Sequence, residues 1–150
     1  MAKIDIHTFI PNDFENFTPQ KMQEHEYELF KSKGDRLMDY LEEESNTVTV
    51  QLDGKNIAIF GIFPLPERGC HGWLFFSKDI GNTGMVIATR MLKGMFSALK
   101  EMGYEWIQTP VRTDFKQGER MMKMLGFSGT DIVEDLLEDG TKYKYWMKVL

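Results

Sequence analysis

Three side chains that could carry acid–base or nucleophilic chemistry stand close together in the sequence, at Glu67, Cys70 and His71. An imidazole accepts a proton near neutral pH, and a positioned carboxylate can act as a general base. Glu105 adds a second carboxylate in the next predicted strand. We therefore name Glu67 and His71 as candidate general bases. The alternative for His71 is a structural or solvated side chain at the start of a strand.

Cys70 is the only cysteine of the chain. A cysteine becomes a strong nucleophile beside a base or a positive charge, and the sequence indicates no such partner, so an ordinary thiol is the simpler interpretation. A single cysteine forms no internal disulfide, which agrees with a reducing compartment. His7 and His25 are too scattered to indicate a metal triad, and no zinc motif, Walker loop or serine nucleophile elbow is present. We expect no metal site.

Composition narrows the classes of function. The chain has 150 residues, 42% of them hydrophobic, and a formal net charge of -5, which suits one domain spanning 1–150 with a core of useful size. The acidic balance, without a block of Lys and Arg, disfavours nucleic acid as a partner. No apolar run has the length of a signal peptide or a membrane span. We expect a soluble protein that is cytoplasmic or packaged inside another particle.

Hydrophobic periodicity and turn residues predict the elements that position these groups. Strands are expected at 3–10, 47–52, 56–63, 71–77, 104–111, 127–133 and 143–149, and helices at 19–33, 35–44, 86–102 and 115–125. Asp53-Gly54 predicts a tight hairpin, and Thr18-Pro19 predicts a helix start with Thr18 as the N-cap. The strand at 71–77 is apolar on both faces, which indicates a central position in the sheet.

The helix at 86–102 carries the clearest apolar stripe of the chain. Its members are Val86, Ile87, Met91, Leu92, Met95, Phe96 and Leu99. A turn from Gly81 to Gly84 precedes it. The N–H groups that a helix leaves free at its start can seat an anion. The alternative is that the two glycines only make a tight turn.

This order of elements resembles the GNAT superfamily of N-acetyltransferases along nearly the whole chain. Two stretches carry the resemblance: Gly72-Trp73-Leu74-Phe75-Phe76 through Gly84 to Met102-Gly103-Tyr104, and the helix end Met122-Lys123-Met124-Leu125-Gly126-Phe127. The resemblance implies an α/β fold of the α+β, mixed-sheet kind. We expect a central, mostly antiparallel sheet of about seven strands with helices on both faces.

In that superfamily acetyl-CoA lies in a splayed gap between the fourth and fifth strands, and its diphosphate rests on N–H groups where the long helix begins. The signature there is Gln or Arg, two residues, Gly, one residue, then Gly or Ala. Counting back from Gly103 places Thr83, Val86 and Ala88 on the three signature positions, of which only Ala88 matches. A second alignment frame places Gly81, Gly84 and Val86 on the same three positions. The resemblance assigns acetyl-CoA binding to Phe76, Ser77, Thr83, Gly84, Met85, Val86, Ile87 and Ala88.

Many members of the superfamily protonate the departing thiolate with a Tyr four residues before the Gly of the Gly-Phe turn. That position is Met122 here, and a thioether cannot donate a proton. Two functions stay open: an acetyl-CoA-dependent N-acyltransferase acting on a small-molecule or protein amine, and a catalytically inactive GNAT-fold protein used for structure or interaction. The layout also resembles GNAT-like and internal virion proteins of bacteriophages, which would imply virion assembly partners or a homo-oligomer.

Overall fold

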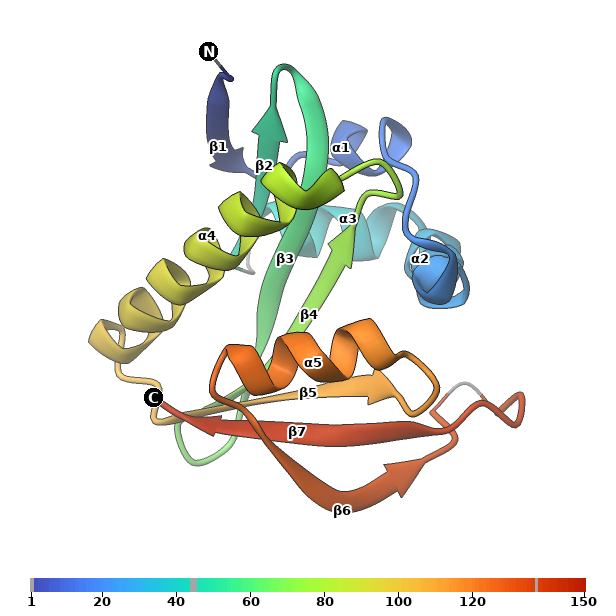
Figure 1. Cartoon of the computed structure of the whole chain (residues 1–150), viewed down its shortest axis with the longest axis vertical. Helices are drawn as coiled ribbons and strands as arrows, with labels where there is room; N and C mark the ends of the chain where they lie inside the picture. Colours follow the sequence, from blue (N-terminus) through green and yellow to red (C-terminus); the bar gives the residue numbers. More distant parts are fainter. Residues whose placement is uncertain (1, 44–45, 137) are drawn as a thin grey trace. The chain divides into compact units, whose positions relative to one another are not determined.

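The computed structural model describes residues 2–43, 46–136 and 138–150. The strands are β1 (Ile4–Thr8), β2 (Thr47–Leu52), β3 (Lys55–Leu65), β4 (Gly69–Phe76), β5 (Trp106–Arg112), β6 (Ser128–Glu134) and β7 (Tyr143–Val149). The helices are α1 (Asn12–Glu15), the 3-10 turn η1 (Lys21–Gln23), α2 (Glu24–Ser32), α3 (Gly34–Glu43), α4 (Gly81–Glu101) and α5 (Lys116–Met124). Figure 1 shows their course along the chain.

The strands form one mixed sheet in the order β1-β2-β3-β4-β5-β7-β6. The pairs β1–β2, β2–β3, β5–β7 and β6–β7 are antiparallel, and β4 pairs with β5 in parallel through Gly69, Cys70 and His71. The predicted mixed sheet of about seven strands is therefore confirmed. The apolar strand β4 takes the central place that its sequence indicated.

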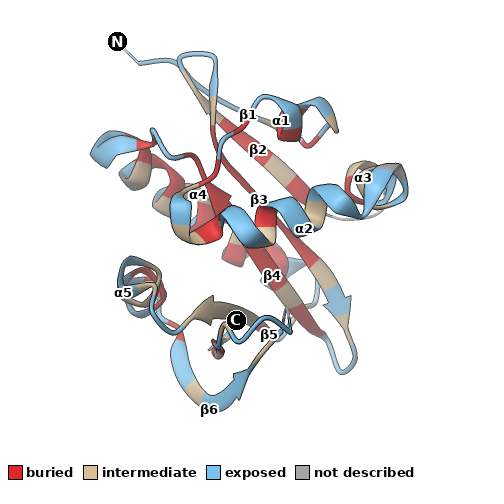
Figure 2. Cartoon of the chain, turned by 90° about the vertical axis from the view of Figure 1, so that its right-hand side faces the viewer, coloured by how far each residue is buried: buried red, intermediate tan, exposed pale blue. Residues whose placement is uncertain are grey.

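The chain divides into two compact units. The first contains the described residues up to Phe63 together with Trp73–Met91, and its core is an aromatic cluster under α1, α2 and α3. The ring of Phe14 meets the rings of Phe9 and Tyr27 edge to face, each at 5.1 Å between centroids, a geometry that aromatic pairs favour. Figure 2 shows the buried residues concentrated along β2, β3 and β4.

The second unit contains Pro64–Gly72 and Leu92–Leu150. Strands β5, β7 and β6 form the part of the sheet that lies in this unit. The rings of Phe96 and Phe127 pack edge to face, with 5.6 Å between their centroids. The apolar residues of α5 and of the turn after it, Met121, Met122, Leu125 and Phe127, are buried. Gly126 has φ +88, which fits its expected role in reversing the chain at the Leu-Gly-Phe turn.

The hairpin predicted at Asp53-Gly54 is confirmed, with φ of +51 and +82 at the two positions. Three other predictions are wrong. Strand β3 continues through Pro64 to Leu65. Its pairing with β2 ends at Gly61, and a proline is tolerated in a strand at an edge that is no longer paired. Thr18-Pro19 does not start a helix, and the long helix begins at Gly81 instead of Val86. Within the described residues, no helix combines the length and apolar character needed to cross a membrane.

Candidate functional site

The candidate site is built around the end of β4, where the chain's own side chains meet the strand's backbone. Gln23 lies at the N-terminal boundary of α2 and is 8% exposed. Its amide nitrogen Nε2 donates to the Leu74 carbonyl at 2.8 Å, and its oxygen Oε1 accepts from the Phe76 N–H at 2.9 Å. One carboxamide thus satisfies a carbonyl and an amide of β4 that are two residues apart.

These two backbone groups lie on the edge of β4 opposite β3. Ser77 N donates to the Ile57 carbonyl of β3 at 2.9 Å, and backbone groups alternate between the two edges of a strand. Leu74 and Phe76 therefore present their backbone groups to the other edge, the one on which β5 follows β4 in the strand order. This is the edge beside which the superfamily resemblance places acetyl-CoA.

The segment before Gln23 also runs along this edge. Gln20 N donates to the Phe76 carbonyl, and Lys78 N donates to the Thr18 carbonyl, both at 2.9 Å, so that Pro19 and Ser77 form an antiparallel bridge. Figure 1 shows this stretch between α1 and α2 passing the end of β4. The Thr18-Pro19 pair thus makes an isolated bridge to the end of β4, because Thr18 offers its carbonyl to Lys78 and Pro19 needs no N–H partner.

The predicted cofactor residues fall on both sides of the turn into α4. Phe76 and Ser77 are buried at the end of β4. Thr83 is the third residue of α4, so Val86, Ile87 and Ala88 are already inside the helix. Each N–H inside an α-helix donates to the carbonyl four residues earlier. The N–H groups of those three residues are therefore used within α4, and the ones at its start that the helix leaves unused are those of Gly81, Asn82 and Thr83.

Side chains near the start of α4 depart from the expected stripe. Val86 is 52% exposed and does not belong to the apolar face, which is a correction to the sequence-based prediction. The buried face of this part of α4 follows the helical repeat and consists of Gly84, Ile87, Ala88 and Leu92. A Cβ added to Gly84 would lie 2.6 Å from Ile80 Cγ1, so packing against Ile80 already requires a glycine there. Met85 is half-buried.

The candidate bases Glu67 and His71 lie in the second unit, together with Glu105. Glu67 is exposed in the turn before β4, with φ +59. Glu105 forms an exposed ion pair with Arg68 at 3.3 Å. His71 stands opposite Gln108 of β5, three residues beyond Glu105, and burial lowers the pKa of its imidazole. The ring is therefore neutral at pH 7, and His71 stays a candidate base whose lowered pKa makes it a weaker proton acceptor.

Two other expected groups are unreactive. Cys70 is fully buried, its Sγ lies 3.7 Å from the Trp106 carbonyl, and burial raises the pKa of its thiol to about 11. The thiol is protonated at neutral pH, which argues against the nucleophile alternative. Met122, at the position of the superfamily's proton donor, is 6% exposed and packs in the core. Among the described residues, no group of three or more His, Cys, Asp and Glu side chains could hold a metal ion.

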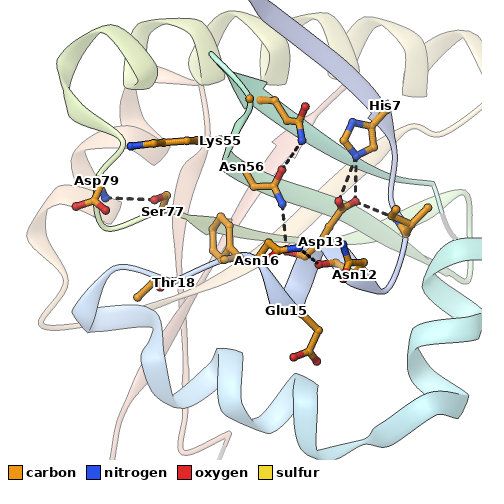
Figure 3. Close-up of a pocket in the computed structure, with 14 residues that line it drawn as sticks. His7, Asn12, Asp13, Glu15, Asn16, Thr18, Lys55, Asn56, Ser77 and Asp79 are labelled. Atoms are coloured by element: carbon orange, nitrogen blue, oxygen red, sulfur yellow. Dashed lines mark hydrogen bonds and ion pairs between the residues drawn. The ribbon is translucent and has the colours of Figure 1, made fainter.

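A polar cavity of about 670 Å³ in the first unit was not predicted from the sequence (Figure 3). The buried carboxylate of Asp13 lies at its wall, where its Oδ2 accepts from Thr49 Oγ1 at 2.7 Å and from Ile10 N at 2.9 Å. His7 Nε2 lies 3.1 Å from the same oxygen. Asn56 Nδ2 donates to the Asp13 carbonyl at 3.3 Å. This network ties α1 to β1, β2 and β3. His7 and Asp13 are brought together only by the turn after β1.

Comparison with solved structures supports the fold. An acetyltransferase of the GNAT family from Bacillus anthracis aligns with a TM-score of 0.72 at 13% identity, covering 99% of this chain and 96% of that one. The ribosomal-protein-S18-alanine N-acetyltransferase of Escherichia coli aligns at 0.69 and 14% identity, covering 98% and 94%. A spermidine N-acetyltransferase chimera from Vibrio cholerae aligns at 0.75 and 12% identity, covering 97% and 95%. No protein-family model and no curated protein matches the sequence.

The chain therefore has the GNAT acetyltransferase fold. Proteins of this fold typically use acetyl-CoA, so the residues present can be tested against that cofactor. The start of α4 fits a diphosphate, because Gly81, Asn82 and Thr83 are exposed and no acidic residue stands in the first turn. The edge of β4 does not fit, because Gln20 and Gln23 already hold the backbone groups of Leu74 and Phe76.

Proposed function

We propose that this protein is a catalytically inactive GNAT-fold domain that acts by binding or assembly. The proposal is carried by the occupation of the β4 edge: the Leu74 carbonyl and both backbone groups of Phe76 already have partners from the segment Gln20 to Gln23. An acyl-CoA that paired along this edge would have to displace a buried side chain whose two hydrogen bonds are well formed.

The chemistry around the site supports the same function. A methionine stands where a proton donor to the leaving thiolate is expected, and it is buried. In the frame counted back from Gly103, Val86 takes the place of the signature's central glycine, and its N–H is used inside α4. Binding partners of such a domain would be macromolecular, and the resemblance in layout to phage internal virion proteins suggests a place in a virion assembly.

Acetyl-CoA binding tests this proposal directly. At 1 mM ligand, a dissociation constant of 10 µM would stabilise the fold by about 2.7 kcal/mol, which corresponds to a rise in melting temperature of roughly 5–11 °C for a chain of this size. We expect no saturable rise, and no acetyl transfer to spermidine or to a peptide with an N-terminal alanine, the acceptor classes of two structural relatives. A saturable rise of that size, or transfer above the rate without protein, would refute the proposal.

The second candidate is an acetyl-CoA-dependent N-acyltransferase, and the open start of α4 favours it. The N–H groups of Gly81, Asn82 and Thr83 at the start of α4 agree with the signature frame that begins at Gly81, and neutral His71 could serve as the base. Asn82→Glu would place a negative charge against a bound diphosphate, whereas Ala98→Glu would place the same charge on an exposed position farther along α4. This candidate requires that acetyl-CoA bind and that only the first variant weaken the binding.

A further inference from the structure

The contact between Gln23 and β4 has the form of a strand pairing made by one side chain. A residue in a neighbouring strand offers its N–H and its carbonyl to the groups that it faces, and the Gln23 carboxamide offers the same two groups to Leu74 and Phe76 at 2.8 and 2.9 Å. A ligand with two successive secondary amides, such as the pantetheine arm of CoA, could make one of these hydrogen bonds with each amide. The side chain and such a ligand therefore compete for the same pair of backbone atoms.

The backbone around Gln23 is anchored independently of its side chain. Gln23 N donates to the Gln20 carbonyl at 2.8 Å, and Gln20 N donates to the Phe76 carbonyl at 2.9 Å. One turn further along α2, the Tyr27 hydroxyl donates to the carbonyls of Phe14 and Phe17. Removing the carboxamide thus frees two atoms of β4 while the segment and α2 keep their other attachments.

We infer that Gln23 is an autoinhibitory latch, and that its carboxamide keeps closed a latent site on β4 for amide-bearing ligands of the pantetheine class. The inference rests on the proposed function, since it gives the physical reason for the loss of acyl-CoA binding. Loss of the latch frees the Leu74 carbonyl and the Phe76 N–H together. Because the Phe76 N–H is buried and the Leu74 carbonyl is half-buried, a ligand whose amides satisfy both is favoured over a ligand that satisfies one.

Gln23→Met tests the latch, because it keeps the length of the side chain and removes both hydrogen bonds. Gln51→Met is the matched control, because the Gln51 carboxamide donates to Asn56 Oδ1 at 2.8 Å in the same unit. Binding of CoA and of free pantetheine is measured by calorimetry for both variants and the unaltered chain. Amide exchange of Phe76 and Ser77 is measured by NMR on the same samples.

We expect Gln23→Met to bind pantetheine and CoA at least tenfold more tightly than the unaltered chain, while Gln51→Met matches the unaltered chain. Exchange of the Phe76 N–H should accelerate, and that of the Ser77 N–H, which donates to β3, should not. Gln23→Leu also removes both hydrogen bonds, so it serves as a second variant with the same direction of change if the methionine variant fails to fold.

The outcomes separate the latch from the proposed function. A folded Gln23→Met variant that binds no better than the unaltered chain overturns the latch and leaves the proposed function standing. CoA binding by the unaltered chain overturns the proposed function, and equal affinity of the variant would then overturn the latch as well. Tighter binding of the variant together with faster exchange at Phe76 supports the latch in either case.

Discussion

Replacement of Asp13 by alanine should strongly destabilise the first unit, because this carboxylate is both buried and fully engaged. Asp13 is 5% exposed, and its Oδ2 accepts from Thr49 Oγ1 and Ile10 N at 2.7 and 2.9 Å, with His7 Nε2 at 3.1 Å. Thr49 is 0% exposed, so its hydroxyl would lose its acceptor where water cannot replace it.

The magnitude follows from these contacts. Hydrogen bonds to charged groups contribute about 1.5–3 kcal/mol each, and a buried donor left without a partner costs about 1–3 kcal/mol. Since the His7 imidazole is partly exposed and can turn to water, we assign the loss mainly to Thr49 and Ile10. We expect Asp13→Ala to lower the free energy of unfolding by roughly 3 kcal/mol, a fall in melting temperature of about 6–12 °C.

Calorimetry and urea unfolding of four variants would measure this loss. Asp79→Ala is the matched control, because Asp79 lines the same cavity but is exposed, and a change there should stay within about 0.5 kcal/mol. Thr49→Val and the double variant complete a cycle that isolates the Asp13–Thr49 pair. A loss below about 1 kcal/mol for Asp13→Ala, or a coupling energy near zero, would refute the argument that this network holds α1 to the sheet.

Two further predictions concern the second unit. Burial raises the Cys70 pKa to about 11 from 9.0 in the unfolded chain, so the folded state holds the thiol proton more tightly. The contribution of this group to stability is therefore present below pH 9 and is lost as pH rises toward 11. At pH 8 the native protein should resist alkylation by iodoacetamide while the urea-unfolded protein reacts, and equal rates of alkylation would contradict the burial of the thiol. A Cβ at Gly69 would lie 2.0 Å from Trp106 Cζ2, whereas a Cβ at Gly94 meets no heavy atom within 4 Å. Gly69→Ala should therefore lower the free energy of unfolding by about 1–3 kcal/mol through overpacking and shift the fluorescence of Trp106. Gly94→Ala should instead stabilise α4 by up to about 1 kcal/mol. A lower melting temperature for Gly94→Ala than for Gly69→Ala would contradict this packing.

The sequence by itself determined the parts of this fold that depend on local preference and periodicity. Asp53-Gly54 specifies a turn because both positions adopt positive φ, which few residue pairs tolerate. The apolar character of 71–77 on both faces indicated a central strand, and β4 is central. The GNAT resemblance followed from the order of such elements, which is why it could be recognised without a matching signature.

Only the tertiary structure decided the state of the candidate site. Gln23 contacts backbone atoms of Leu74 and Phe76, 51 and 53 positions along the chain, and a glutamine at a helix start has no local mark that separates this use from solvent exposure. Thr18-Pro19 satisfies the rules for a helix start, yet the free edge of β4 offers Thr18 and Gln20 better partners. Local residue types set which structures a segment can adopt, and long-range hydrogen bonds to unpaired backbone groups selected among them.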